Sequence, residues 1–88
     1  MELENLREEI KKTDLEILGL MKRRLDLAKE VGLQKIMDGK DVIDPSVEEA
    51  VIGRYRTFAE ENGMDPDRTE EMCKILIEES VILQKSLR

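Results

Sequence analysis

The chain has 88 residues, a formal net charge of −6 and no histidine, and 41% of its residues are charged. An acidic balance of this size excludes nucleic acid or an anionic membrane as the main partner, because either would need a concentrated basic surface. Cys73 is the single cysteine, which excludes the usual zinc sites, histidine-assisted nucleophilic catalysis and an intrachain disulfide. No apolar run approaches the roughly 20 residues of a membrane span, so we predict a cytoplasmic protein. We also predict a single domain over residues 1–88 and no metal or cofactor.

A long first helix is predicted over about residues 3–38. Apolar residues recur at spacings of three and four, as they do along one face of a helix; they are Leu3, Leu6, Ile10, Ile17, Leu20, Leu27 and Val31. Nothing interrupts this pattern before Asp38-Gly39, where glycine can take the left-handed conformation that ends many helices.

Two shorter helices are predicted after the loop of residues 40–45. Ser46-Val47-Glu48-Glu49 matches the capping box, so the second helix is expected over about residues 46–61, ended by Asn62-Gly63. Asp65 then precedes Pro66, the pattern of a capping residue followed by proline at the first helical position, and the third helix is expected over about residues 66–86. The predicted fold class is therefore all-α, with one long and two shorter helices.

The length of the first helix predicts a second copy of the chain. A helix of about 35 residues is about 52 Å long, whereas a compact chain of this size has a radius of gyration of about 12 Å. The helix must therefore project from its own protomer, and burying its apolar stripe against a second copy is strongly favoured over leaving it in water. We predict an intertwined homodimer of six helices.

Polar residues occupy positions on the predicted apolar faces. On a helical wheel Arg24 and Lys35 point along the stripe of the first helix, about 20° apart in azimuth. Glu48 shares the face of Val51, Ile52, Tyr55, Phe58 and Ala59, and Ser80 and Gln84 lie on the face of Met72, Cys73, Leu76, Ile77, Leu83 and Leu87. Because an unpaired buried charge costs several kcal/mol, these groups must meet one another, water or a ligand, and we expect them to line a shared cavity.

Simpler interpretations apply to each residue taken alone. Arg24 or Lys35 could set the register of a coiled coil while its charged end reaches water. Glu48 could be a first-turn acid favoured by the helix dipole, and Asp44 could shape the loop before Pro45, with its backbone as the potential ligand. Two cations in phase, together with inward polar groups on the other two helices, favour the shared site.

Arg7 requires a separate interpretation. It lies about 25 Å along the same helix from Arg24 and is rotated by about 100°, so it cannot join that site within its own chain. In an antiparallel dimer the start of one long helix can lie beside the middle of the other. Arg7 is therefore expected to complete the cavity of the partner.

The order and spacing of these residues resemble the all-α, AroQ-class chorismate mutases over essentially the whole chain. The resemblance rests on Leu6-Arg7, Asp14, Arg24, the stretch Ala28…Val31…Lys35, Asp44, Glu48 and the segment Ile77-Glu78-Glu79-Ser80-Val81-Ile82-Leu83-Gln84. It implies the Claisen rearrangement of chorismate to prephenate, a unimolecular step that requires no nucleophile, metal or cofactor.

The resemblance also implies a role for each candidate residue. Arg24 and the partner's Arg7 would grip the two carboxylates of the substrate. Lys35 and Gln84 would donate to the ether oxygen as it gains negative charge. Glu48 and the backbone at Asp44 would hold the ring hydroxyl, and Ser80 a carboxylate oxygen.

One position departs from the family pattern. The family usually carries an arginine immediately before the glutamate of the second helix, and this chain has Val47 there. Two alternatives stand beside the mutase. One is an isochorismate-pyruvate lyase, which shares the fold and a similar cationic site. The other is a non-catalytic helical dimerisation or regulatory module of a shikimate-pathway enzyme, with a vestigial site because of Val47.

Overall fold

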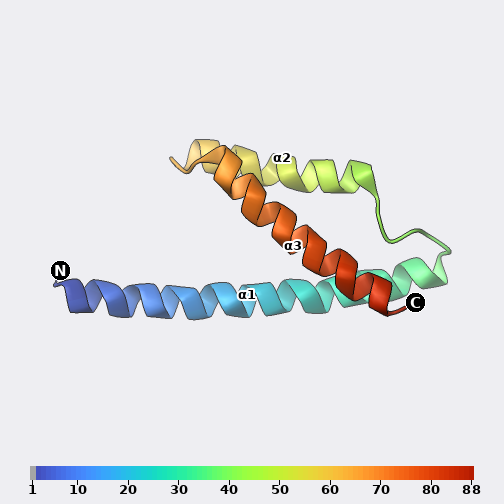
Figure 1. Ribbon diagram of the computed structural model, residues 1–88, viewed down its shortest axis with the longest axis horizontal. Coiled ribbons are helices and arrows are strands. Elements are labelled where there is room, and N and C mark those ends of the chain that lie inside the picture. The colour runs from blue at the N-terminus through green and yellow to red at the C-terminus, as the bar shows by residue number, and fades with distance from the viewer. Residues whose placement is uncertain (1) are drawn as a thin grey trace.

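The computed structural model describes residues 2–88 and consists of three helices (Figure 1). They are α1 (Leu3–Met37), α2 (Pro45–Glu61) and α3 (Pro66–Ser86). No strand occurs within the described residues, so the predicted all-α class with one long and two shorter helices is confirmed. Each end lies within one residue of the expected one. No helix in this part of the chain is both long enough and apolar enough to cross a lipid bilayer.

Glycines end the first two helices as the sequence indicates. Gly39 follows the C-cap residue of α1 and has a φ of 65°, and Gly63 follows the C-cap residue of α2 with a φ of 67°. This left-handed conformation is costly for residues with a Cβ atom. Both chain reversals therefore depend on glycine.

The start of α2 corrects one expectation. The N-cap is Asp44, whose carboxylate accepts a hydrogen bond from the Val47 N–H at 3.4 Å, and Pro45 occupies the first turn. Ser46, the expected cap, lies inside the helix and donates its hydroxyl to Asp44 Oδ1 at 2.8 Å. The capping-box prediction was wrong because proline is well suited to the first helical position, which places the cap one residue before it.

Helix α3 joins the other two helices. It packs against α2 along one part and against the C-terminal half of α1 along another, whereas α1 and α2 make no contact with each other within residues 2–88. Figure 1 shows α3 running diagonally from the end of α2 to the end of α1. Arg56 of α2 bridges to Asp67 at 2.9 Å and to Glu70 at 3.1 Å, which ties the α2–α3 pair together.

The core of the protomer is small. Its fully buried members are Ala59 and Cys73, and Ala28 is nearly as buried. Phe58 and Met72, which the sequence places on apolar faces, remain 58% and 54% exposed in the protomer. Within residues 2–88 no element of the protomer fully covers these two side chains.

The N-terminal half of α1 projects away from the rest of the protomer. All of residues 2–23 are exposed, including Leu6, Ile10 and Ile17 of the predicted stripe. The radius of gyration is 16.0 Å, well above the roughly 12 Å of a compact chain of this length. The protomer thus leaves a long apolar helix face uncovered.

Candidate functional site

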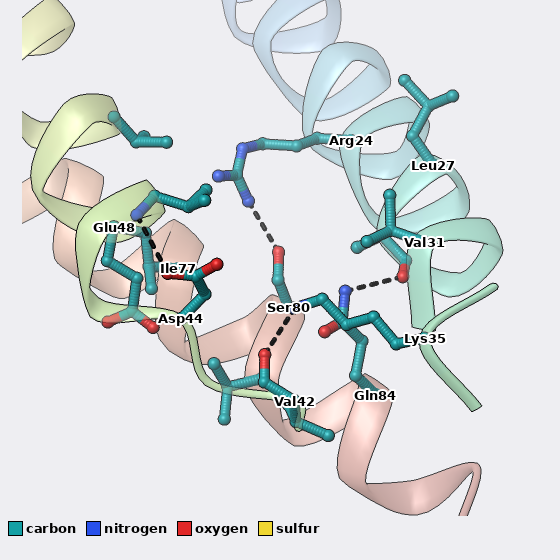
Figure 2. A pocket seen from close by; sticks show the side chains of 14 residues that line it. Arg24, Leu27, Val31, Lys35, Val42, Asp44, Glu48, Ile77, Ser80 and Gln84 are labelled. Carbon is teal, nitrogen blue, oxygen red and sulfur yellow. Dashed lines mark hydrogen bonds between the residues drawn. The ribbon is translucent and has the colours of Figure 1, made fainter. Parts of the chain in front are cut away.

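A pocket of about 270 Å³ lies between the three helices and the loop that joins α1 to α2 (Figure 2). Its walls come from the C-terminal half of α1, the loop around Val42, the first turns of α2 and the C-terminal half of α3. The structure brings together six of the seven predicted site residues in this pocket: Arg24, Lys35, Asp44, Glu48, Ser80 and Gln84.

Arg24 reaches from α1 to α3 and is held there by two acceptors. Its Nη1 donates to the Leu76 carbonyl at 3.0 Å and to Ser80 Oγ at 2.6 Å. Ser80 in turn donates its hydroxyl to the Leu76 carbonyl at 3.1 Å. One nitrogen of the guanidinium is therefore fully used by the protein, while the N–H groups on Nη2 and Nε have no protein acceptor among the described residues.

Lys35 and Gln84 are also oriented by backbone carbonyls. Lys35 Nζ donates to the Val42 carbonyl at 2.6 Å, which ties the end of α1 to the following loop. Gln84 is 6% exposed, and its Nε2 donates to the Ala28 carbonyl at 2.8 Å. An ammonium has three donors and an amide nitrogen has two, so each group retains N–H donors for a ligand. Figure 2 shows both side chains reaching toward the space beside Ser80.

Two carboxylates and an apolar wall complete the pocket. Glu48 lies half-buried in the first turn of α2, and Asp44 caps the same helix. Hydrogen bonds from the Ser46 hydroxyl and the Val47 N–H hold the pKa of Asp44 below its ordinary value of 3.8, so this residue is ionised at neutral pH. The formal charges of Arg24 and Lys35 are therefore balanced by those of Asp44 and Glu48 within one protomer.

Arg7 is the predicted site residue that the protomer does not bring to the pocket. It lies on the projecting part of α1, where its Nη1 contacts Glu4 at 3.4 Å. Both side chains are largely exposed. Its position agrees with the geometric argument that Arg7 cannot serve the site of its own chain.

Sequence reasoning missed the backbone acceptors that orient the donors. The carbonyls of Leu76, Val42 and Ala28 leave no mark in the sequence, because every residue has a carbonyl and only the fold decides which ones face a side chain. It also missed Val42 as a lining residue, whereas Val47, the position at which the family usually carries an arginine, does line the pocket. The available signal for Val42 was its place two residues before Asp44 in the chain.

The fold and the pocket define a class of protein: a small helical protein in which two cations and an amide from different helices line one pocket. Within that class the sequence identifies the family. Residues 6–85 match the family model for chorismate mutase type II, and the chain belongs to this family. The resemblance drawn from the order of Arg7, Arg24, Lys35, Glu48 and Gln84 is thereby confirmed.

Several named relatives share this domain. The chain is 32% identical over 82 residues to the bifunctional chorismate mutase/prephenate dehydratase of Escherichia coli (strain K12), covering 93% of this chain and 21% of that protein. It is 34% identical over 79 residues to the T-protein of Enterobacter agglomerans, covering 90% and 21%. It is 43% identical over 54 residues to the intracellular chorismate mutase of Mycobacterium tuberculosis (strain ATCC 25618 / H37Rv), covering 61% and 51%. The chain thus spans about a fifth of the length of the first two relatives.

Proposed function

We propose that this chain is a chorismate mutase that converts chorismate to prephenate in aromatic amino-acid biosynthesis and acts as a homodimer. The observation that carries the proposal is the set of three donors, Arg24, Lys35 and Gln84. Each is oriented by a backbone carbonyl and each retains N–H groups toward one pocket. A cytoplasmic location, in keeping with the relative named as intracellular, remains our prediction for this chain.

The reaction suits a pocket of this kind because it needs no nucleophile. In a Claisen rearrangement one C–O bond breaks while one C–C bond forms within a single molecule. A site accelerates it by holding the compact, chair-like conformer and by stabilising the negative charge that develops on the ether oxygen. Donors that are already fixed by the protein do this without reorganising during the reaction.

Each pocket residue takes a role that fits its remaining hydrogen-bonding capacity. Arg24 grips one carboxylate of the substrate through Nη2 and Nε, because Nη1 is used by Leu76 and Ser80. Lys35 and Gln84 donate to the ether oxygen. Glu48 and the backbone at Asp44 hold the ring hydroxyl, and Ser80 turns its hydroxyl from Leu76 to a carboxylate oxygen when substrate is bound.

The charge balance of the pocket supports a shared site. One protomer contributes two positive and two negative charges, from Arg24, Lys35, Asp44 and Glu48, so its pocket is formally neutral. A dianion is bound more favourably when a further cation is present. Arg7 of a second copy supplies that cation when the exposed stripe of α1 packs against the equivalent stripe of the partner.

A spectroscopic assay tests the activity. The purified protein is mixed with chorismate, and the loss of chorismate ultraviolet absorbance is followed while the products are separated by chromatography. We expect prephenate as the product. No loss of absorbance at micromolar protein would contradict the proposal, and release of pyruvate from isochorismate without turnover of chorismate would favour the lyase.

A further inference from the structure

Gly32 lies on α1 where it faces Gln84 and Leu87 at the C-terminal end of the chain. The residue is buried, and a Cβ atom at this position would come within 2.8 Å of Gln84 Cγ and 2.9 Å of Leu87 Cδ1. The other helical glycines within residues 2–88 are Gly19 and Gly53, and a Cβ on either of them would meet nothing within 4 Å. Among these positions, the missing side chain is required by packing only at Gly32.

The two neighbours of Gly32 differ in how readily they can move. Leu87 Cδ1 is the end of a flexible, half-buried side chain, which can turn aside. Gln84 Cγ lies in the middle of its side chain, between a backbone-fixed Cβ at 3.3 Å from the added atom and an amide bonded to Ala28. A methyl group at position 32 must therefore displace the Gln84 amide or push α3 away from α1.

We propose that Gly32 is a positioning residue for the reaction, because its lack of a side chain allows the Gln84 amide to bond the Ala28 carbonyl. Ala28 lies one helical turn before Gly32 on α1. The bond fixes one N–H of the amide and directs the other toward the pocket. The kinetic consequence rests on the proposed mutase activity, whereas the structural consequence does not.

Gly32→Ala tests the proposal, with Gly19→Ala as its matched control. Both substitutions add one methyl group to α1 and both replace glycine with a better helix former. Gly19 lies on the charged side of the helix, away from the apolar stripe. General effects on helix stability therefore appear in both variants, and effects on Gln84 appear only in Gly32→Ala.

An NMR measurement reads the Gln84 amide directly. The sequence contains two glutamines, Gln34 and Gln84, so an ¹H–¹⁵N spectrum has two glutamine side-chain amide pairs, assigned with Gln34→Glu. In Gly32→Ala we expect the Gln84 pair to move to the position of a solvent-exposed amide, while Gly19→Ala leaves it unchanged. A Gln84 pair that stays in place in Gly32→Ala would overturn the proposal, whether or not the protein turns over chorismate.

Kinetics then separate positioning from general stability. We expect Gly32→Ala to lower kcat by at least about tenfold with a change in KM below about threefold, since the affected donor acts in the transition state. Gly19→Ala should stay within about twofold of the wild type. In a Gln84→Ala background, adding Gly32→Ala should cost less than about threefold more, and equal losses in both backgrounds would overturn the proposal. Wild-type protein that is inert toward chorismate would refute the mutase and leave the NMR result to decide the role of Gly32.

A second variant keeps the test usable if Gly32→Ala alone does not fold. Gly32→Ala combined with Leu87→Ala removes the contact at 2.9 Å and leaves only the contacts with Gln84. The helical circular dichroism of both variants is compared with that of the wild type. If neither variant folds, the glycine serves the packing of α1 on α3 and not the amide, and the proposal fails.

Discussion

Lys35 is the residue with which the proposed chemistry can be tested most directly. Its ammonium is tied to the Val42 carbonyl at 2.6 Å and faces the pocket. Lys35→Ala should lower kcat/KM for chorismate by more than about 100-fold, the size expected for one fixed donor to a developing negative charge, while light scattering still reports the wild-type assembly. Lys29→Ala, on the exposed side of α1, is the control. A loss of less than about tenfold, near 1.4 kcal/mol, would mean that the role of Lys35 is assigned wrongly.

A substitution at Val47 is predicted to improve substrate binding. It lines the pocket and is 56% exposed, in a position where a cation would face a bound dianion. Val47→Arg should lower KM for chorismate by several fold, up to about tenfold for a charged hydrogen bond in a partly exposed site. Val47→Gln supplies a polar side chain without charge. Equal KM values for the two variants would show that charge at this position is not what limits binding.

At the residue scale the sequence predicted which side chains face the pocket but not what holds them. Arg24 and Lys35 were predictable because helical phase alone placed them among Leu6, Ile10 and Val31. The sequence gives little reason to place Ser80 alone in the site. Its hydrogen bond with Arg24 joins residues 56 positions apart in the chain, so only the folded structure shows it. Gly32 has no side chain, so an analysis of polar and apolar helix faces does not identify it. Its only signal was a glycine inside a helix, which often has a packing reason.

The stability of the first turn of α2 is expected to depend on pH through the N-cap residue Asp44. The pKa of Asp44 is lowered in the folded chain, first by the Ser46 hydroxyl and then by the Val47 N–H. Because the folded pKa lies below the ordinary value of 3.8, the ionised cap contributes stability above that pH and loses it as the pH falls through the folded pKa.

Asp44→Asn isolates this contribution, since asparagine keeps the capping geometry without an ionisable group. The difference in thermal midpoint between the wild type and Asp44→Asn should be constant from about pH 5 to 7 and shrink below about pH 4. Both proteins are measured by circular dichroism at one fixed concentration, because the midpoint of an associating protein depends on concentration. Melting curves whose separation stays constant down to about pH 2.5 would contradict the prediction.

At the element scale the chain breaks were predictable and one cap was not. Gly39 and Gly63 adopt left-handed conformations that few other residues can take, so the ends of α1 and α2 follow from local chemistry. Asp65-Pro66 was predicted correctly as the start of α3. The start of α2 carries both the Asp44-Pro45 dipeptide and the capping-box pattern at Ser46, and the structure follows the dipeptide because proline is well suited to the first helical position.

The uncovered stripe of α1 gives a prediction for the whole molecule. Ile10 is 61% exposed in the protomer and lies on the stripe, whereas Leu15 is 63% exposed and lies on the opposite side of the helix. Ile10→Glu should reduce the mass measured by light scattering from twice 10.2 kDa toward 10.2 kDa and remove activity with it. Leu15→Glu should leave both unchanged. A wild-type protein that is monomeric at micromolar concentration would refute the dimer itself.

Mixed dimers test whether the site is shared. Arg7→Ala and Arg24→Ala chains should each be weakly active alone, because every site then lacks one cation. After the two are unfolded and refolded together, each mixed dimer should regain one complete site, with Arg24 from one chain and Arg7 from the other. Activity that stays at the level of the separate variants would rule out this arrangement.

At the scale of the whole molecule the sequence predicted the projection of α1, because a helix of 35 residues exceeds the size of a compact chain of 88. It did not predict that Phe58 and Met72 would remain exposed in the protomer. A helical wheel identifies an apolar face but not which neighbour covers it, and the arrangement of α1, α2 and α3 decides that.

Helices α1 and α2, which make no contact with each other within residues 2–88, form two separate walls of the pocket. Among the described residues, these helices are connected through α3 and the loop around Val42, and the pocket separates them. A bound dianion would bridge the two helices, because Arg24 and Lys35 of α1 and Glu48 of α2 would all contact the same molecule. Part of the binding energy of the ligand would thus go into holding α1 and α2 at a fixed separation across the pocket.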